Sequence, residues 1–152
     1  MNIEIRSISA LETYPVRHPI LRAGRPIEEC YFNGDELDTT VHLGVFINGT
    51  ITAVASYLQH QDPTVEPLTS LKKEQCYQLR GMAVLQDMQG KQLGKKLLLH
   101  AEQLFMNKGV KALWFNARAI AIPFYEKMGY HKASGAFEIT PIGTHYKMYK
   151  LL

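Results

Sequence analysis

The sequence has few of the residues that form disulfide cross-links in small proteins or bind metal ions. It contains two cysteines, Cys30 and Cys76, among its 152 residues, and they form neither a CxxC motif nor a cluster with histidines. The six histidines also lack the spacing of metal ligands. We therefore predict no disulfide framework and no metal site, and we expect both thiols to be ordinary residues of a cytoplasmic protein.

Long apolar runs and one-sided charge are missing too. No apolar segment approaches the ~20 residues that a membrane-spanning helix needs, and residues 1–12 lack the basic and apolar regions of a signal peptide. The formal net charge is +3, with lysines that are scattered or paired. We therefore expect no membrane partner. Nucleic-acid binding would rest on this mild positive charge alone, and no clustered basic stripe supports it, so we expect no nucleic-acid partner.

What the sequence does contain is an alternation of strand and helix patterns. Asn48 and Gly49 join two apolar runs and give the strongest short signal for a β-hairpin. The expected strands are residues 2–8, 41–47, 51–58, 78–84, 112–115, 130–137 and 145–151. The expected helices begin after Ser9, at Leu93 and near Ala121. This order predicts an α/β fold with a mixed sheet and helices on its faces, in a single domain over residues 1–152.

Two segments, residues 17–40 and 59–71, carry glycine, proline and charged residues without clear periodicity. In a domain that is otherwise regular, such segments are more often substrate-facing loops than linkers. The first segment holds Arg17, Arg22 and Arg25, for which two interpretations are open. They recognise a carboxylate, or they form a solvated face, which is the default expectation for charged side chains.

Residues 78–99 have the pattern of a strand, a tight turn and an amphipathic helix. Gly90 and Gly94 let a ligand approach the main chain where the helix begins, and Lys91 and Lys95 add positive charge there. Free N–H groups at such a helix start favour a phosphate or pyrophosphate. The alternative is a well-capped turn between strand and helix that binds no ligand.

The same stretch resembles a known motif. Its segment AVLQDMQGKQLGKKLL is similar to the acyl-CoA-binding motif of the GNAT N-acetyltransferases, in which Gln89 and Gly94 match the first and last positions. Gln92 stands where the middle glycine belongs, so we expect a slightly different loop conformation or a side chain near the pyrophosphate. The segments NARAIAIPFYEKMGY and FEITPIGTHYKM resemble later parts of the same family. The resemblance covers nearly the whole chain and implies the GNAT fold, with a central sheet of six to seven strands.

The resemblance also implies acetyl-CoA as co-substrate and assigns residues to it. The main chain of Met82, Ala83 and Val84 is expected to pair with the pantetheine arm. The pyrophosphate is expected on the amides of Gln89, Gly90, Lys91, Gln92, Leu93, Gly94 and Lys95. Asn116 is expected to bond the pantetheine or an ordered water, although a helix N-cap is an equal alternative.

Acyl transfer from a thioester to an amine needs a neutral amine, a stabilised oxyanion and a proton for the departing thiolate. At pH 7 an amine of pKa about 10.4 is neutral in roughly one molecule in 2,500, which costs about 4.6 kcal/mol. Of these three requirements, the neutral amine is therefore the one for which a catalytic group, a general base, matters most. Tyr125 matches the family's usual general acid, and its alternative role is that of a plain aromatic side chain beside Phe124.

The general base is less clearly marked. The central strand carries Gln78 and Arg80 where several family members have a glutamate. His145 is our candidate, because an unperturbed imidazole has a pKa of about 6.5 and the fold brings the tail strand near the active cleft. Glu29, Glu138 and a water chain are the alternatives.

The sequence therefore predicts a GNAT-type N-acetyltransferase that moves an acetyl group directly from acetyl-CoA to a primary amine. Cys30 and Cys76 lack the setting of a nucleophile, which argues against an acyl-enzyme. The acceptor stays open among a small metabolite, a peptide N-terminus and a protein lysine. A homodimer is also an open expectation, since related folds often pair. The alternative function is a CoA-binding or sensing module without catalysis.

Overall fold

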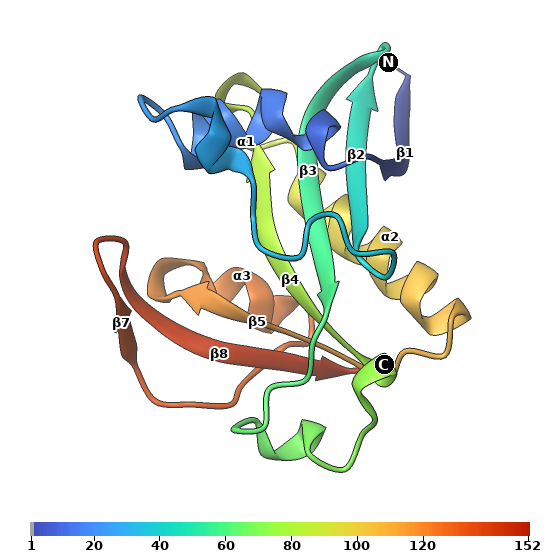
Figure 1. Cartoon of the computed structure of the whole chain (residues 1–152), viewed down its shortest axis with the longest axis vertical. Helices are drawn as coiled ribbons and strands as arrows, with labels where there is room; N and C mark the ends of the chain where they lie inside the picture. The colour runs from blue at the N-terminus through green and yellow to red at the C-terminus, as the bar shows by residue number, and fades with distance from the viewer. Residues whose placement is uncertain (1) are drawn as a thin grey trace. The chain divides into compact units, whose positions relative to one another are not determined.

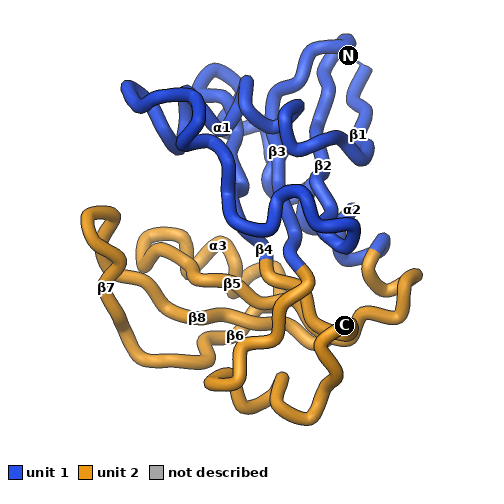
Figure 2. Tube along the Cα trace, viewed as in Figure 1, with its two compact units in different colours: residues 1–58, 79–104 blue, residues 59–78, 105–152 orange. Residues whose placement is uncertain are grey.

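Strands and helices alternate along the chain as the sequence predicts. The computed structural model describes residues 2–152 and, within them, eight β-strands and three α-helices (Figure 1). The strands form a mixed sheet in the order β1-β2-β3-β4-β5-β8-β6, and β7 pairs with β8. The chain divides into two compact units, residues 1–58 with 79–104 and residues 59–78 with 105–152 (Figure 2). The predicted fold class is confirmed.

The first unit contains β1 (Ile3–Ile8), α1 (Tyr14–Leu21), β2 (Val41–Ile47), β3 (Thr50–Gln59), most of β4 (Cys76–Val84) and most of α2 (Leu93–Asn107). Asn48 and Gly49, between β2 and β3, have φ angles of 50° and 84°. Both are left-handed, as a two-residue hairpin turn of the mirrored type requires. Strands β2 and β3 accordingly pair in antiparallel fashion, so the predicted hairpin is confirmed.

Helix α1 packs within this unit through Val16, which contacts Val54 and Ala83. The chain enters it through a 3-10 turn, where the Glu12 amide donates to Ser9 Oγ and the Ser9 amide donates to Glu12 Oε1. This reciprocal pair satisfies amides that a helix start leaves free. The predicted cap at Ser9 is wrong, because the N-cap residues of the 3-10 turn and of α1 are Ala10 and Thr13, and Ser9 forms its reciprocal pair one residue before the turn.

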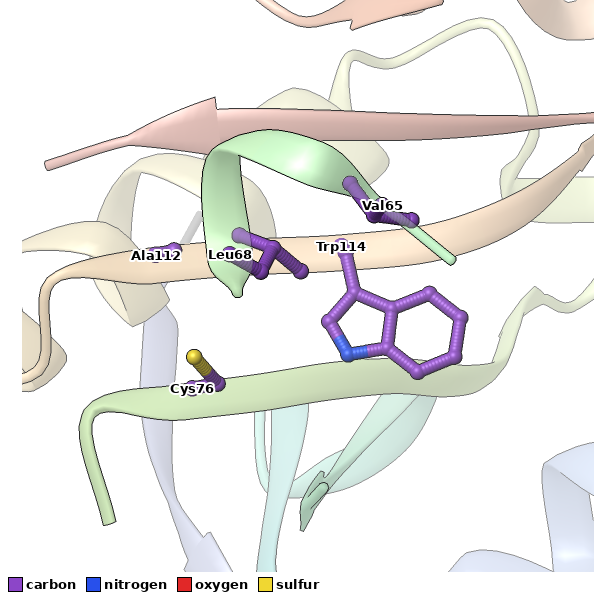
Figure 3. Close-up of a cluster of buried hydrophobic side chains, with 5 residues drawn as sticks. All are labelled: Val65, Leu68, Cys76, Ala112 and Trp114. Atoms are coloured by element: carbon purple, nitrogen blue, oxygen red, sulfur yellow. The ribbon is translucent and has the colours of Figure 1, made fainter. Parts of the chain in front are cut away.

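The second unit contains η3 (Glu66–Leu68), η4 (Lys73–Gln75), β5 (Ala112–Arg118), η6 (Ala119–Ala121), α3 (Ile122–Lys127), β6 (His131–Lys132), β7 (Phe137–Ile139) and β8 (Gly143–Leu151). One of its core clusters comprises Val65, Leu68, Cys76, Ala112 and Trp114 (Figure 3). The Trp114 indole N–H donates to the His60 carbonyl at 2.7 Å. The loop at residues 59–71 therefore contributes buried side chains to the core of this unit.

The predicted strand at residues 130–137 is wrong. The segment forms two short strands, β6 and β7, and between them the Ser134 hydroxyl accepts the Lys147 amide of β8 at 2.9 Å. A side-chain acceptor thus replaces the main-chain acceptor that a continuous strand would supply.

Strand β5 continues to Arg118, three residues beyond the predicted end at residue 115, because exposed Asn116 alternates with buried Ala117 as in a half-buried strand. These changes give eight strands and leave the fold class as predicted.

Among residues 2–152, none of the helices combines the length and apolar character that crossing a membrane requires. In the same part of the chain, no three His, Cys, Asp or Glu side chains gather as metal ligands do. Cys30 and Cys76 are buried free thiols, and burial raises the pKa of each. A raised pKa disfavours the thiolate, which makes both residues poor nucleophiles.

Candidate functional site

Strand β4 leads into the stretch that the sequence marks as an anion site. In the second unit, its first residues, 76–78, pair in parallel with residues 112–114 of β5. In the first unit, Gly81 has a φ of 63°, and a Cβ there would lie 2.6 Å from the Phe32 ring. Only glycine meets both conditions without strain. Residues 82–84, predicted to contact the pantetheine arm, follow directly.

The loop after β4 is fixed to the end of that strand. The Leu85 amide donates to the Thr52 carbonyl at 2.9 Å. After a 3-10 turn, η5 (Gln86–Met88), Gln89 Nε2 donates to the Val84 carbonyl at 3.1 Å. The structure therefore brings two predicted site residues, Val84 and Gln89, into contact. This bond also gives a physical reason for an amide side chain at the first motif position.

Helix α2 begins with a set of free amides. Its first main-chain bond is donated by Lys96 to the Gln92 carbonyl at 3.1 Å. The amides of Gln92, Leu93, Gly94 and Lys95 therefore have no acceptor within the helix. The partial positive charge of a helix start adds to that of the exposed Lys95 side chain. This end of α2 is suited to bind an anion.

Gln92 has a φ of 62°, in the left-handed region that favours glycine. Gly90, two residues earlier, has a φ of 80°, and a Cβ there would meet no atom within 4 Å. The loop thus places a non-glycine residue where glycine would sit without strain. This conformation gives a physical reason for the motif glycine that Gln92 replaces. The Gln92 side chain is exposed.

We expect Gln92→Gly to raise the free energy of unfolding by about 0.5–1 kcal/mol. A left-handed non-glycine residue carries about 1–2 kcal/mol of strain, and the greater freedom of an unfolded glycine offsets part of that gain. Denaturant unfolding followed by circular dichroism measures the change. Gln92→Ala is the matched control, because alanine keeps the Cβ and should give no gain. Equal gains from the two variants would rule out a backbone cause.

Tyr125 lies in the second unit, on α3, where its ring packs against Phe115 with 4.4 Å between ring centroids. Phe124 and Tyr130 complete an aromatic cluster, with centroids 5.1 and 6.0 Å from that of Tyr125. Burial raises the pKa of the Tyr125 phenol to about 12. The group therefore keeps its proton in neutral and mildly alkaline solution, as a proton donor must.

Tyr125 and His145 lie on opposite faces of the ladder that β5 and β8 form. His145 is opposite Arg118 in this antiparallel register. Directly opposed residues point to one face, and neighbours along a strand alternate between faces. His145, Arg118 and Asn116 therefore share a face, whereas Phe115, which packs against Tyr125, points to the other. The structure thus brings Asn116 and His145 to the same face and leaves Tyr125 on the opposite one.

Asn116 lies inside β5 with an exposed side chain, so its alternative role as a helix N-cap is wrong. His145 is 5% exposed, and its Nδ1 lies 2.7 Å from the Gly143 carbonyl oxygen. Because a carbonyl only accepts hydrogen bonds, Nδ1 carries the proton and the neutral ring keeps its lone pair on Nε2. That lone pair is what a general base uses.

The two carboxylates named as alternative bases, Glu29 and Glu138, each have a side-chain partner. Glu29 forms an exposed ion pair with Arg25 at 2.7 Å. Glu138 accepts a hydrogen bond from the Thr144 hydroxyl at 2.6 Å. Arg25, one of the three arginines considered for carboxylate recognition, is therefore matched by a carboxylate of its own segment.

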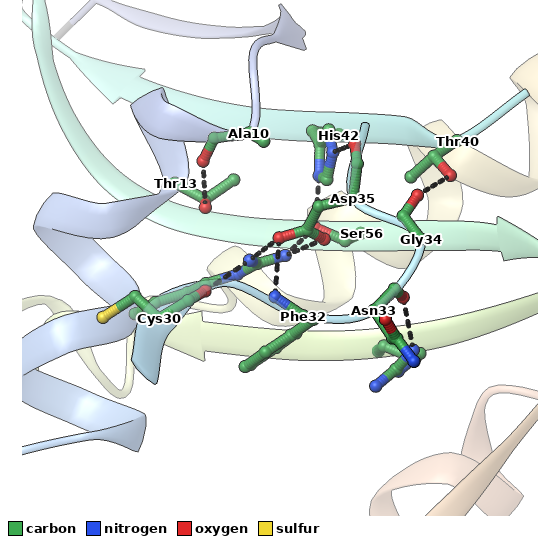
Figure 4. Close-up of polar contacts among 12 residues, drawn as sticks. Ala10, Thr13, Cys30, Phe32, Asn33, Gly34, Asp35, Thr40, His42 and Ser56 are labelled. Atoms are coloured by element: carbon green, nitrogen blue, oxygen red, sulfur yellow. Dashed lines mark hydrogen bonds and ion pairs between the residues drawn. The ribbon is translucent and has the colours of Figure 1, made fainter. Parts of the chain in front are cut away.

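The first unit contains a buried polar network that no motif in the sequence predicts (Figure 4). Arg17 is fully buried and bonds Asp35 through two nitrogens, at 2.6 and 3.2 Å. It also donates to Ser56 Oγ at 2.7 Å, and His42 Nδ1 lies 2.6 Å from the same hydroxyl. The default expectation of a solvated Arg17 is wrong. No motif connects it to Asp35, which lies 18 positions away.

The sequence pattern of the acetyltransferase (GNAT) family matches residues 5–130. The chain belongs to this family. It is 39% identical over 150 residues to the uncharacterized N-acetyltransferase YitI of Bacillus subtilis (strain 168), an alignment that covers 99% of this chain and 97% of YitI. The GNAT protein described here is therefore an N-acetyltransferase, and its family uses acyl-CoA as the acyl donor.

Solved structures share the fold of this GNAT protein. The ribosomal-protein-S18-alanine N-acetyltransferase of Escherichia coli is similar with a TM-score of 0.76 and 21% identity, over 99% of this chain and 94% of that one. An acetyltransferase of Bacillus subtilis in complex with CoA is similar with a TM-score of 0.66 and 15% identity, over 99% and 98% of the two chains. At these identities the likeness shows the fold alone, and it agrees with the mixed sheet described above.

Proposed function

We propose that this GNAT protein transfers an acetyl group from acetyl-CoA directly to a primary amine. The observation that carries the proposal is the start of α2, where the amides before Lys96 have no acceptor within the helix and a left-handed loop precedes them. A diphosphate supplies the acceptor oxygens and the negative charge that such a helix start favours. Lys91 and Lys95, both exposed, add positive charge at the same place.

The residues assigned to the donor lie mainly along β4 and the loop after it. We assign the pantetheine arm to the main chain of Met82, Ala83 and Val84. The diphosphate is assigned to the amides of Gln89, Gly90, Lys91, Gln92, Leu93, Gly94 and Lys95. Asn116, whose side chain is exposed on β5, is assigned to the pantetheine or to a water bound to it.

Tyr125 is the proton donor in this proposal. The amine nitrogen forms the C–N bond, the C–S bond breaks, and the departing thiolate takes the phenol proton. The pKa of about 12 supports this role, because the phenol is fully protonated at neutral pH. A thiol of pKa about 8.5 is the stronger acid by roughly 3.5 units, so proton transfer from the phenol to the thiolate is uphill by about 5 kcal/mol. Tyr125 therefore assists the departure of the thiolate and does not initiate it, and the phenol regains its proton from solvent.

His145 is the general base in this proposal. Its Nε2 lone pair accepts the proton that the amine loses, and its Nδ1 keeps its own proton, which it donates in a hydrogen bond to the Gly143 carbonyl. The base acts at the amine nitrogen and the acid acts at the sulfur. Both atoms are bonded to the same carbonyl carbon, so the proposal requires His145 and Tyr125, which lie on opposite faces of the β5–β8 ladder, to reach one centre at the end of the ladder, where Arg118 pairs with His145.

We expect His145→Gln to lower kcat/KM at neutral pH by about 100-fold, a usual size for a general-base contribution, and to remove the acidic limb of its pH profile. The KM for acetyl-CoA should not change, because the base contacts the acceptor and not the donor. Steady-state kinetics across pH measure both effects. His131→Gln is the matched control, since His131 is an exposed histidine of the same unit. An acidic limb that survives in His145→Gln would leave the water chain as the base.

Release of free thiol from acetyl-CoA, in the presence of a panel of primary amines, tests the proposed function as a whole. We expect thiol release that depends on the amine, with an equal amount of acetylated amine detected by mass spectrometry. CoA binding without amine-dependent release would indicate a CoA-sensing module. Equal release with and without amine would indicate thioester hydrolysis. Either result would overturn the proposal.

A further inference from the structure

His145, the base in the proposed function, lies between side chains of two neighbouring strands. In the strand registers, Arg118 of β5 is directly opposite His145 on one side, and Phe137 of β7 is directly opposite it on the other. Directly opposed residues point to the same face, with Cβ atoms about 4.5–5.5 Å apart. The three side chains therefore form a row across one face of the second unit, which we call the His145 row.

The two sides of the His145 row differ in polarity. The centroid of the Phe137 ring lies 6.1 Å from that of the His145 ring, so an apolar ring borders the imidazole on that side. Arg118, on the other side, is the exposed last residue of β5. A charged group on a molecule that approaches His145 therefore finds its partner on the Arg118 side.

Arg118 differs from the other five arginines of the chain, because each of those has a partner. Three form ion pairs with carboxylates, namely Arg6, Arg17 and Arg25. Two lie beside the Phe32 ring and donate to main-chain carbonyls, namely Arg22 and Arg80. Within residues 2–152, the Arg118 side chain makes no hydrogen bond, ion pair or ring contact. Its five N–H donors are free to bind a ligand.

The carboxylates beside the His145 row, Asp62 and Glu138, already have partners. Asp62 accepts hydrogen bonds from Lys147 Nζ at 2.5 Å and from the Thr64 amide at 2.8 Å. Glu138 follows Phe137 on β7 and therefore points to the opposite face, where it accepts a hydrogen bond from Thr144. The charge of Lys147 is matched by Asp62, so the Arg118 side of the row carries one unmatched positive charge.

The His145 row also lies next to a residue assigned to the acetyl donor. Asn116, assigned to the pantetheine or its water, precedes Arg118 by two residues on the same face, about 7 Å along a strand. In an α-amino acid, the nitrogen and the carboxyl carbon are both bonded to Cα and lie about 2.5 Å apart. One small molecule can therefore reach His145 with its amine and Arg118 with its carboxylate.

We propose that Arg118 binds a carboxylate of the acceptor, so that the acceptor is an amine that also carries a carboxylate, as an amino acid does. This inference rests on the acetyl transfer proposed above. The planar guanidinium fork matches a carboxylate through two parallel hydrogen bonds. The single unmatched charge fits a carboxylate better than a phosphate dianion. Among the open acceptors, this assignment selects a small metabolite over a protein lysine.

Arg118→Gln tests the assignment with glycine, alanine and leucine and with the amides of the same amino acids, compared at equal concentrations of neutral amine. In the unaltered protein we expect kcat/KM to favour the amino acids by about tenfold or more, the usual size of a charge-assisted hydrogen-bonded pair. In Arg118→Gln we expect KM for the amino acids to rise by about the same factor. The KM for acetyl-CoA and for the amides should stay within about twofold, because neither depends on the Arg118 charge.

Lys111→Gln is the matched control. Lys111 is an exposed cation just before the other end of β5, so this variant loses the same charge from the same unit and should keep the preference for amino acids. Arg118→Lys keeps the charge but loses the planar fork, so it should raise KM for the amino acids less than Arg118→Gln does. Added salt should raise KM for the amino acids and not for the amides, because an exposed charge pair is screened.

The outcomes separate this inference from the proposed function. Four results would overturn the carboxylate assignment and leave acetyl transfer standing: amides acetylated as well as amino acids, aminomethylphosphonate acetylated better than glycine, an unchanged KM for amino acids in Arg118→Gln, or a raised KM for acetyl-CoA in that variant. The last result would assign Arg118 to the donor. Absence of amine-dependent thiol release with every amine would overturn acetyl transfer itself, and the role of Arg118 with it.

Discussion

Replacing Tyr125 by phenylalanine should lower kcat about 100-fold and leave the KM for acetyl-CoA unchanged within about twofold. Phenylalanine keeps the ring that packs 4.4 Å from the Phe115 ring and removes the hydroxyl alone. The thiolate then departs without its proton donor, whereas the groups assigned to CoA remain in place. Steady-state kinetics at a saturating amine concentration measure the change.

The pKa of Tyr125 gives this prediction a pH signature. A phenol whose pKa is raised to about 12 keeps its proton as the pH rises. Loss of the acid should therefore cause no decline in kcat of the unaltered protein below about pH 10, and Tyr125→Phe should show the same profile at a lower level. Phe124→Leu is the control, because it alters packing beside Tyr125 without removing a proton. An unchanged kcat in Tyr125→Phe would remove Tyr125 from the mechanism.

Asp35→Asn should lower the free energy of unfolding by about 3–5 kcal/mol, the usual cost of removing one partner of a buried ion pair. The side chains of Arg17 and Asp35 are 0% and 4% exposed, so the arginine left behind cannot turn to water. That loss is a large part of the ~5–15 kcal/mol by which most domains are stable. Denaturant unfolding followed by circular dichroism measures it.

The Arg25–Glu29 pair offers a matched control in the same unit. Its side chains are 63% and 38% exposed, and exposed pairs contribute about 0–1 kcal/mol, so Glu29→Gln should have a small effect. Arg17→Met combined with Asp35→Leu removes both buried charges and should restore most of the stability, or restore folding if Asp35→Asn abolishes it. Equal losses in Asp35→Asn and Glu29→Gln would contradict this view of the buried pair.

The elements predicted correctly are those whose signals are local. Asn48 and Gly49 marked the hairpin because neighbouring left-handed residues favour one turn type. The apolar spacing from Leu93 marked α2, and Gly109, with a φ of 81°, follows its end as a C-terminal glycine does. In both cases the information lies within a few residues of the element, so no knowledge of the rest of the chain is needed.

Features that depend on distant contacts were not predicted. Arg17 is buried because Asp35 and Ser56 meet it from other segments, and nothing near it in the sequence distinguishes it from a solvated arginine. The tail strand divides because Ser134 bonds Lys147 of another strand. These contacts are specified by the fold as a whole, which a single sequence without alignment does not reveal.

The candidate site also has one part that local sequence signals predict and another part that depends on distant contacts. The amides at the start of α2 follow from where a helix begins, so the main-chain part of the site could be predicted. The cluster of Arg22 and Arg80 around the Phe32 ring could not be predicted, because these three residues come from separate segments. The strain at Gln92 also needed the structure, since the residue type alone does not give its φ of 62°.

Calorimetric titration of the full chain with CoA, and separately with pantetheine, tests the central claim most directly. Because the diphosphate is assigned to the free amides at the start of α2, we expect CoA to bind in the micromolar range and pantetheine to bind at least tenfold more weakly. Added salt should weaken the binding of CoA more than that of pantetheine. No uptake of CoA, or equal affinities for the two compounds, would contradict the assignment.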